Sequence, residues 1–196
     1  MPPLVSTAWL ADHLEDPALR MLDDSWYLPS AGRDARAEYE AGHLPGARFF
    51  DLDAASAQDS PLPHMLPTPE AFADLVGALG VGDDNMVVVY DGSGVNLSAP
   101  RVWWMFRAFG HERVAVLDGG SGRWRAEGRP LESGTPSITP ARFTATPRPE
   151  LVRDLPAVRA QAAGGDSQIV DMRPAGRFAG VAPEPRPGLR GCGHFR

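Results

Sequence analysis

The chain of 196 residues has a single cysteine, no long apolar run and no excess of positive charge. The lone cysteine, Cys192, excludes a disulfide framework within the chain and any metal site built from several cysteines. No apolar stretch approaches the roughly 20 residues of a membrane-spanning helix, and Met1-Pro2-Pro3 is followed by no basic and apolar leader. We therefore predict a cytoplasmic protein with no membrane partner.

The net charge of −6 also argues against a nucleic-acid partner, because sequence-independent binding of phosphates needs clustered basic side chains. The basic residues are arginines, so local anion sites remain possible. The five histidines show no paired spacing of metal ligands, and we predict neither a metal nor a cofactor. A hydrophobic content of 43% suffices for a core, and the length suits one domain or one domain and part of a second.

The chain is organised around a buried strand that leads through a glycine loop into a helix. Residues 87–90 are an apolar, largely β-branched run, and residues 98–107 have a helical pattern. The first N–H groups of such a helix have no helical partner, and the helix dipole adds positive potential, so the loop is predicted to hold an anion. The candidate anion-cradle loop consists of Asp91, Gly92, Ser93, Gly94 and Val95, and Asp91 stands where a nucleophile would stand.

Apolar patterns and capping residues predict alternating strands and helices on both sides of this loop. The expected helices are 8–14, 34–40, 69–79, 98–107 and 123–127, and the expected strands are 20–23, 47–51, 87–91 and 113–118. Strands and helices that alternate at this length imply right-handed crossovers and a parallel sheet covered by helices on both faces. The predicted fold class is therefore α/β.

The composition changes after residue 128. Residues 129–150 are rich in Pro, Thr and Ser and poor in large apolar residues, which is typical of a linker. Beyond them, residues 155–162 are predicted to form a helix and residues 168–171 a strand. We therefore divide the chain into a first domain at 1–128, a linker at 129–150 and the start of a second domain at 151–196.

The second domain repeats motifs of the first. The matching segments are Met21-Leu22-Asp23 with Ile169-Val170-Asp171, and Asp34-Ala35-Arg36 with Gly176-Arg177-Phe178. The motif Gly42-His43-Leu44-Pro45-Gly46 has only the altered sequence 191–196 as its counterpart, where the second copy stops. The second domain is therefore predicted to be truncated before it reaches a strand, glycine loop and helix of its own.

Five segments together form a specific combination of motifs. They are 39–47 (YEAGHLPGA), 88–91 (VVYD), 99–104 (APRVWW), 117–120 (LDGG) and 171–178 (DMRPAGRF). The combination resembles the two-domain rhodanese-type sulfurtransferases, which use thiosulfate or 3-mercaptopyruvate. The resemblance implies a duplicated rhodanese-like domain, in which only the second copy carries the catalytic cysteine, in a loop of the form Tyr-Cys-Gly-Ser-Gly-Val.

Asp91 matches the position of that cysteine, so the loop 91–95 resembles the silent first copy. A thiolate at a helix N-terminus is stabilised as an anion, can attack a sulfur donor and can hold sulfane sulfur as a persulfide, whereas a carboxylate has no comparable chemistry. We therefore expect Asp91 to occupy the loop as an internal anion. Cys192 follows no predicted strand and precedes no predicted helix, so we expect an exposed thiol without a catalytic role.

The resemblance also assigns Arg177 and Arg186 to binding of the anionic substrate, and a guanidinium presents a planar fork suited to a carboxylate. The alternative is that both are solvated side chains of a loose tail. The implied reaction moves sulfane sulfur from 3-mercaptopyruvate or thiosulfate to a thiophilic acceptor such as cyanide. Because no cysteine stands in a cradle loop, the chain alone is predicted to be inactive, and a small-molecule sulfur donor would bind only if the second domain were complete.

A second hypothesis is an inactive rhodanese-like binding or regulatory module, or one half of a split enzyme. An incomplete domain would expose apolar side chains, chiefly Ile169, Val170 and Phe178, and could self-associate through them. A phosphatase is the weakest alternative, because phosphatases of this fold also need a loop cysteine. His43 precedes Leu44-Pro45 in a turn, and we predict that it bonds to the backbone and is not a general base.

Overall fold

The computed structural model describes residues 1–165, 167–183 and 185. These residues fall into two compact units. The first unit comprises Met1–Tyr27 and Asp34–Arg148, and the second comprises Leu28–Arg33 and the described residues from Pro149 onward. Within this described part of the chain, no helix is both long enough and apolar enough to cross a membrane.

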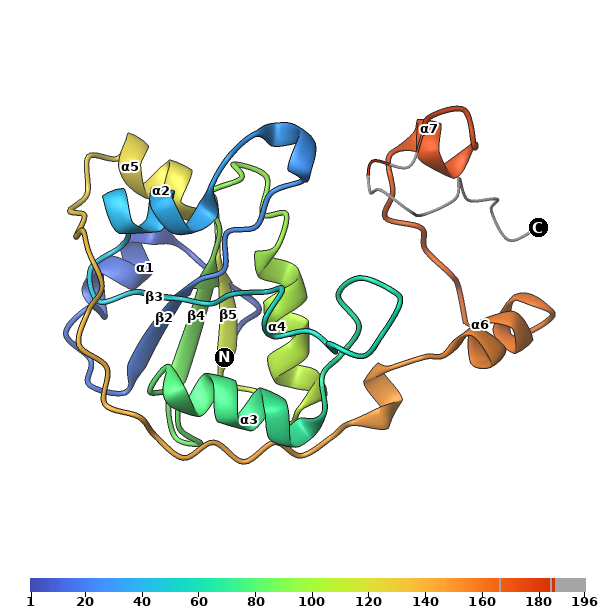
Figure 1. Ribbon diagram of the computed structural model, residues 1–196, viewed down its shortest axis with the longest axis horizontal. Helices are drawn as coiled ribbons and strands as arrows, with labels where there is room; N and C mark the ends of the chain where they lie inside the picture. Colours follow the sequence, from blue (N-terminus) through green and yellow to red (C-terminus); the bar gives the residue numbers. More distant parts are fainter. Residues whose placement is uncertain (166, 184, 186–196) are drawn as a thin grey trace. The chain divides into compact units, whose positions relative to one another are not determined.

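A five-stranded parallel sheet forms the centre of the first unit (Figure 1). Its strands are β1 (Leu4–Val5), β2 (Leu19–Asp23), β3 (Arg48–Phe49), β4 (Met86–Tyr90) and β5 (Val114–Leu117), in the order β1-β5-β4-β2-β3. Val88 of β4 pairs with Met21 on one side and with Ala115 on the other. This central place explains the run of valines in β4, because a parallel strand covered on both faces needs apolar side chains at successive positions.

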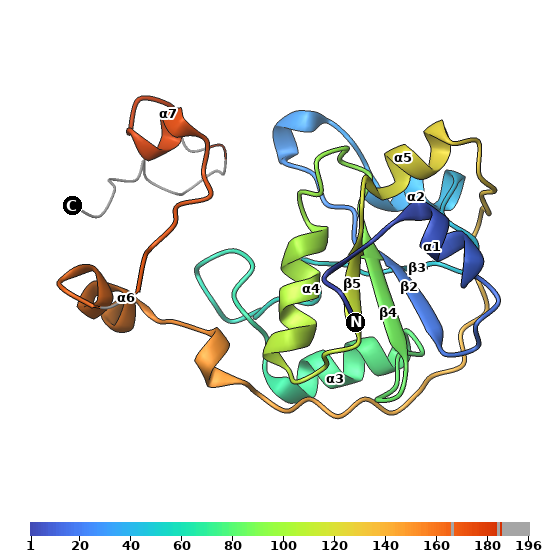
Figure 2. The same cartoon turned by 180° about the vertical axis from the view of Figure 1, so that it is seen from behind.

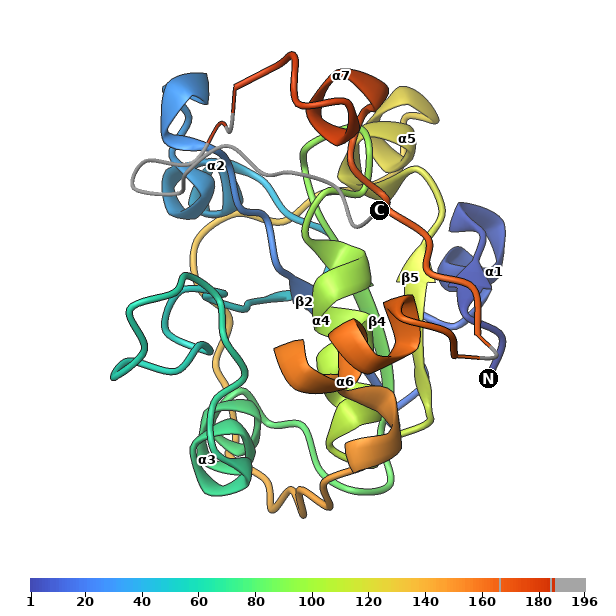
Figure 3. The ribbon, with the colours of Figure 1, turned by 90° about the vertical axis from the view of Figure 1, so that its right-hand side faces the viewer.

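Helices cover both faces of the sheet. They are α1 (Thr7–Asp12), α2 (Ala35–Ala41), α3 (Pro69–Ala78), α4 (Ala99–Ala108) and α5 (Gly120–Ala126). On one face, α3 and α4 pack around Phe72 and Phe106, and Figure 3 shows α4 lying across the strands. On the other face lie α1 and α5 (Figure 2), whose side chains Leu10 and Trp124 are fully buried. The predicted α/β class with helices on both faces is confirmed.

Side-chain caps begin three of these helices. The side chains of Ser6, Asp34 and Thr68 accept hydrogen bonds from backbone N–H groups three residues further on. Each thereby pairs one of the N–H groups that a helix N-terminus leaves without a partner. The boundaries predicted for the helix at 69–79 are therefore correct to within one residue.

Three elements differ from the predicted ones. β1 was not predicted, because two residues carry too little pattern, and it forms by pairing with β5 at the edge of the sheet. The strand predicted at 47–51 is reduced to the two residues of β3. The helix predicted at 123–127 begins earlier, at Gly120, because Gly119 adopts a left-handed conformation (φ +80°) that turns the chain directly from β5 into α5.

The segment 129–148 packs against the first unit, although its composition is typical of a linker. Figure 1 shows it running from α5 along the lower edge of the unit, past α3. Its N–H groups at Ala141 and Arg148 donate to the carbonyls of Gly77 and Ala108, at the ends of α3 and α4. Phe143 is 7% exposed and contacts the core rings. The segment thus pairs helix-terminal carbonyls that would otherwise lack donors, and one aromatic side chain anchors it.

The second unit contains α6 (Leu155–Ala162), α7 (Ala175–Phe178) and two single-turn 3-10 helices, Pro29–Ala31 and Pro149–Leu151. The helix predicted at 155–162 is confirmed, with Asp154 as its N-terminal cap. The strand predicted at 168–171 is wrong for the described structure, in which these residues are extended but unpaired. A parallel strand exists only through hydrogen bonds to a neighbour, and no described residue supplies one.

Candidate functional site

The site begins at the carboxyl end of β4, where Asp91 follows Tyr90 and is 1% exposed. Its Oδ2 accepts hydrogen bonds from the backbone N–H groups of Ser98 (2.9 Å) and Ala99 (3.1 Å), at the start of α4. Its Oδ1 accepts from the N–H (2.9 Å) and the hydroxyl (2.5 Å) of Ser93. The carboxylate therefore lies at the N-terminus of α4 and uses the donors there, where the helix dipole favours a negative charge.

Three more N–H groups in and beside the loop donate to serine hydroxyls. Ser93 Oγ accepts from the N–H groups of Val95 (3.2 Å) and Leu97 (3.1 Å), and Ser25 Oγ accepts from Gly92 (2.8 Å). Gly94 turns the loop with a φ of +80°. The predicted cradle residues are thus brought together, with Asp91 and Ser93 as the acceptors inside the loop.

Two neighbouring loops hold the Asp91 loop in place. At the end of β2, Ser25 Oγ donates to Asp23 Oδ1 (2.5 Å) while it accepts from the Asp91 loop. At the start of α5, the N–H of Ser121 donates to the carbonyl of Asp91 (3.1 Å), and Gly120 lies directly against that carbonyl. Because β2 and β5 flank β4 in the sheet, all of these groups meet at the carboxyl ends of the strands, where ligands bind in parallel sheets.

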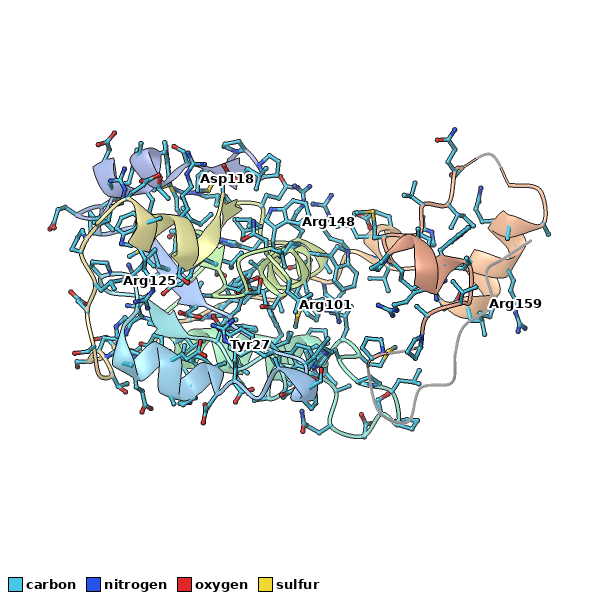
Figure 4. All side chains as sticks on the ribbon, turned by 90° about the horizontal axis from the view of Figure 1, so that it is seen from above. Tyr27, Arg101, Asp118, Arg125, Arg148 and Arg159 are labelled. Carbon is cyan, nitrogen blue, oxygen red and sulfur yellow. The ribbon has the colours of Figure 1, made fainter. Side chains whose placement is uncertain are left out.

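Two tyrosines, Tyr27 and Tyr90, lie at this edge. The hydroxyl of Tyr27 donates to Glu38 (2.8 Å) and lies against the backbone of Gly92, and Figure 4 labels it together with Arg101 of α4. Burial raises the pKa of Tyr90 well above its ordinary value, and the negative charge of Asp23 adds to that effect. The Tyr90 hydroxyl accordingly stays protonated and accepts from the N–H of Leu44 (3.2 Å).

Asp23, Asp24 and Asp91 place three carboxyl groups at the ends of two adjacent strands. Burial raises the pKa of Asp23, and hydrogen bonds from Ser25 act in the opposite direction. Burial raises the pKa of Asp24 well above its ordinary value, and the charges of Asp91 and Asp23 raise it further. Asp24 is fully buried, and neither of its carboxyl oxygens has a hydrogen-bond partner. Asp24 is therefore a source of instability at the pH values where it must ionise.

We expect Asp24→Ala to raise the free energy of unfolding by about 1–2 kcal/mol at pH 8, and by less at pH 5. The folded-state pKa lies above the unfolded value, so the folded state binds more protons between the two values. Stability from this group is present at low pH and is lost as the pH rises toward the folded-state pKa. Urea denaturation at both pH values measures the difference.

The exposed Asp59 provides the matched control, because Asp59→Ala removes a carboxylate from the surface. This control variant is expected to leave the pH dependence of unfolding unchanged. A gain from Asp24→Ala of equal size at both pH values, or a loss at both, would contradict the assignment of Asp24 as an uncompensated buried acid.

Of the other residues predicted for function, the structure describes Arg177 and His43. Arg177 lies in the last turn of α7 and is half-buried, whereas Arg186 and Cys192 lie outside the described residues. His43 is buried, and its Nδ1 lies 2.9 Å from the carbonyl oxygen of Tyr39. Its backbone N–H donates to the carbonyl of Glu132. The prediction that His43 bonds to the backbone is confirmed. Among the described residues, no three His, Cys, Asp or Glu side chains come together to hold a metal ion.

Sequence reasoning missed Ser25, Ser121 and Gly120 as members of the site. A serine two residues after a strand carries little signal by itself, and its partner Gly92 lies 67 positions away in the sequence. The Gly119-Gly120 pair was visible as the end of a strand, but its contact with Asp91 depends on β4 and β5 being neighbours. These residues become identifiable only once the strand order is known.

Comparison with known proteins gives one family. The family model described as Rhodanese-like domain matches residues 6–127. The 3-mercaptopyruvate sulfurtransferase of Rattus norvegicus is 49% identical over 191 residues, which cover 95% of this chain and 64% of the relative. The thiosulfate sulfurtransferase of Bos taurus is 45% identical over 198 residues, which cover 98% of this chain and 66% of the relative. The chain therefore spans slightly less than two thirds of the length of these relatives.

Solved structures agree with the sequence relatives. The crystal structure of SseA from Escherichia coli, described as a 3-mercaptopyruvate sulfotransferase, matches with a TM-score of 0.88 and 40% identity, over 100% of this chain and 72% of that chain. The crystal structure of Tum1 from Saccharomyces cerevisiae matches with a TM-score of 0.87 and 30% identity, over 99% of this chain and 68% of that chain. Both similarities extend beyond residues 6–127.

Proposed function

Because the chain belongs to the rhodanese family, we propose that it is part of a sulfurtransferase that moves sulfane sulfur from 3-mercaptopyruvate or thiosulfate to a thiophilic acceptor such as cyanide. Relatives whose names carry each of the two donors support the proposal. We retain the cytoplasm as the proposed compartment, although one relative is described as mitochondrial.

Within this proposal, the first unit is the non-catalytic copy and residues 151–196 begin a second copy. The supporting observation is the carboxylate of Asp91, which accepts the N–H donors of Ser93, Ser98 and Ala99. In a catalytic loop, a thiolate at this place would attack the donor sulfur and form a sulfur–sulfur bond while the donor's own bond to that sulfur breaks, C–S in 3-mercaptopyruvate or S–S in thiosulfate, and the electron pair leaves on pyruvate enolate or sulfite. The acceptor would then attack the outer sulfur and regenerate the thiolate. A carboxylate does not undergo either step, so this chain alone is expected to be inactive.

Two arginines would hold the carboxylate or sulfonate-like end of the donor. Arg177 supplies a guanidinium from the last turn of α7, and Arg186 is proposed for the same role from outside the described residues. A guanidinium binds such an anion through two parallel N–H donors, which fixes the direction of the donor sulfur.

The experiment that tests the function is a thiocyanate-release assay with both donors. The chain is compared with a chimera in which its residues 1–186, which include both proposed arginines, are followed by the remaining C-terminal part of the E. coli 3-mercaptopyruvate sulfurtransferase. We expect no release above the buffer blank from the chain, release from the chimera, and a rise in KM for the donor in the chimera after Arg177→Met. Arg159→Met, in the exposed part of α6, is the control and is expected to leave KM unchanged.

An inactive chimera that is folded by circular dichroism would count against the proposed activity. Thiocyanate release by the chain alone that disappears in Cys192→Ser would contradict the non-catalytic assignment.

A second candidate function is a rhodanese-like module that docks a partner, including the other half of a split enzyme. The supporting observation is the exposure of Ile169 (48%), Val170 (72%) and Phe178 (46%). Such a surface favours association, either with a partner or between copies of the chain. Sedimentation and binding of an apolar dye measure this property, and a stable monomer that binds no dye would contradict the split-enzyme version.

A further inference from the structure

Residues 141–148 form the end of the first unit and lead directly into the second unit at Pro149. They contain no helix or strand, and among these residues, all of which the structure describes, only Phe143 is buried. A segment with one buried side chain and a largely exposed backbone depends on few contacts. It can therefore detach while the rest of the unit stays folded.

Polar groups attach segment 141–148 at several points. Three backbone N–H groups, those of Ala141, Thr146 and Arg148, donate to carbonyls of the first unit at 2.7–2.9 Å. The N–H and the hydroxyl of Thr144 donate to Asp83 at 2.6 and 2.9 Å, and both of these residues are exposed. Hydrogen bonds that exchange with water add little net stability, so the buried ring of Phe143 supplies much of the attachment.

The ring of Phe143 contacts a buried histidine. His111 is 7% exposed, and its ring centroid lies 5.6 Å from that of Phe143 and 5.6 Å from that of Phe106 in α4. Its Nε2 is buried and has no hydrogen-bond partner among the described residues. Because an imidazolium carries a proton on both ring nitrogens, protonation of either tautomer leaves a buried, unpaired N–H at Nε2 between two phenyl rings.

Two charged side chains face the His111 ring. Arg113 approaches from the residues before β5 and Asp83 from the loop before β4, whereas α4 and segment 141–148 contribute phenyl rings. Burial lowers the pKa of His111 below its ordinary value of 6.5. The charge of Arg113 acts in the same direction, and the charge of Asp83 and the backbone of Asn85 and Arg113 oppose it.

The direction of this shift sets the direction of the pH effect. A histidine that is exposed when the segment detaches binds a proton more readily than the buried ring does. The stability of the attached segment is therefore fully present above pH 6.5 and is lost as the pH falls below that value toward the folded-state pKa.

We propose that His111 and Phe143 form an acid-sensitive latch, which holds segment 141–148 on the first unit at neutral pH and releases it when His111 is protonated. Release frees a stretch of chain that spans about 25 Å when extended, and so lengthens the connection to the second unit. The latch does not depend on sulfur transfer.

The test is hydrogen exchange of the full chain, measured by NMR at pH 8 and pH 5, where ordinary carboxyl groups stay ionised. We expect the protection factors of the Ala141, Thr146 and Arg148 amides to fall by about fivefold or more at pH 5. The amides of His43 and Glu132, which pair with each other's carbonyls at the other end of segment 129–148, are the internal reference and should keep their protection.

His111→Gln supplies a side chain that is neutral at both pH values, so protection at 141–148 should no longer depend on pH. His13→Gln is the matched control, because His13 stacks on Trp9 in α1 and should leave the pH response unchanged. No loss of protection in the unmodified chain, an equal loss at both ends of segment 129–148, or a loss that persists in His111→Gln would overturn the latch.

If His111→Gln does not fold, the unmodified chain still decides the question. An NMR titration follows the ring signals of His111 alongside the protection of residues 141–148. We expect one shared midpoint below pH 6.5. Separate midpoints would overturn the proposal, because another group would then control release.

Discussion

Asp91→Ala is expected to lower the free energy of unfolding by about 3–4 kcal/mol, because it leaves buried N–H groups without an acceptor. The N–H groups of Ser93, Ser98 and Ala99 all donate to this carboxylate, and Asp91 is 1% exposed. Alanine supplies no oxygen, and Ser98 and Ala99, which donate two of the lost bonds, are buried. Denaturation in urea at pH 7 measures the change.

Formate distinguishes an internal anion from a residue that merely fills space. In Asp91→Ala, formate can occupy the position of the lost carboxylate, so unfolding is expected to shift to higher urea as formate increases. Chloride at the same ionic strength is the control for screening. Asp91→Asn keeps one acceptor oxygen and is expected to lose less stability. Equal stability of the alanine variant and the unmodified chain would contradict the role assigned to Asp91.

Gly120→Ala is expected to destabilise the protein by about 3 kcal/mol, through backbone strain and through crowding of the Asp91 loop. Gly120 has a φ of +54°, which L side chains rarely adopt, and a Cβ there would lie within 3.0 Å of the carbonyl of Asp91. The Cβ is fixed by the backbone of residue 120 and the oxygen belongs to the backbone of Asp91, so no side-chain rotation relieves the contact. Denaturation in urea again measures the loss.

Gly122 provides a control in the same helix. A Cβ at Gly122 has nothing within 4 Å, and Gly122→Ala is expected to stabilise α5 by about 0.5–1 kcal/mol through higher helix propensity. If both substitutions stabilise the protein, then the start of α5 does not press on the Asp91 loop as the structure indicates.

The strand–loop–helix unit at 86–108 was predictable because each part carries its own local signal. The valine run of β4 marks a strand buried on both faces, Gly92 and Gly94 mark the loop, and Pro100 suits the first turn of α4. The place of Asp91 at the helix N-terminus follows from that order alone. The sequence alone therefore identifies Asp91 and its loop as the centre of the site.

The surroundings of Asp91 could not be found in the same way. Ser25 and Ser121 reach the loop from the ends of β2 and β5, and only the strand order β5-β4-β2 makes them neighbours. The sequence predicts a linker at 129–150 because the composition there is poor in large apolar residues, yet backbone N–H groups and the side chain of Phe143 attach residues 129–148 to the rest of the first unit. Amino-acid composition gives no information on backbone carbonyls, such as those at the ends of α3 and α4, that need a hydrogen-bond donor.

The strand that was wrongly predicted at 168–171 has a related explanation. Ile169 and Val170 have the side chains of a strand, but strand formation depends on a hydrogen-bonding neighbour that local sequence cannot supply. Met21 and Leu22 form part of β2 because β3 and β4 lie beside that strand. Apolar side chains therefore give a strand only where neighbouring strands pair with its edges.

Intact-mass spectrometry of the chain after incubation with 3-mercaptopyruvate or thiosulfate tests most directly whether the Asp91 loop has replaced sulfur chemistry with an internal anion. We predict that the desalted chain gains no sulfur atom, whereas the E. coli 3-mercaptopyruvate sulfurtransferase treated in parallel does. The appearance of one added sulfur atom on the chain, removable by cyanide and absent from Cys192→Ser, would contradict that prediction and show that the chain holds a persulfide without a cysteine at position 91.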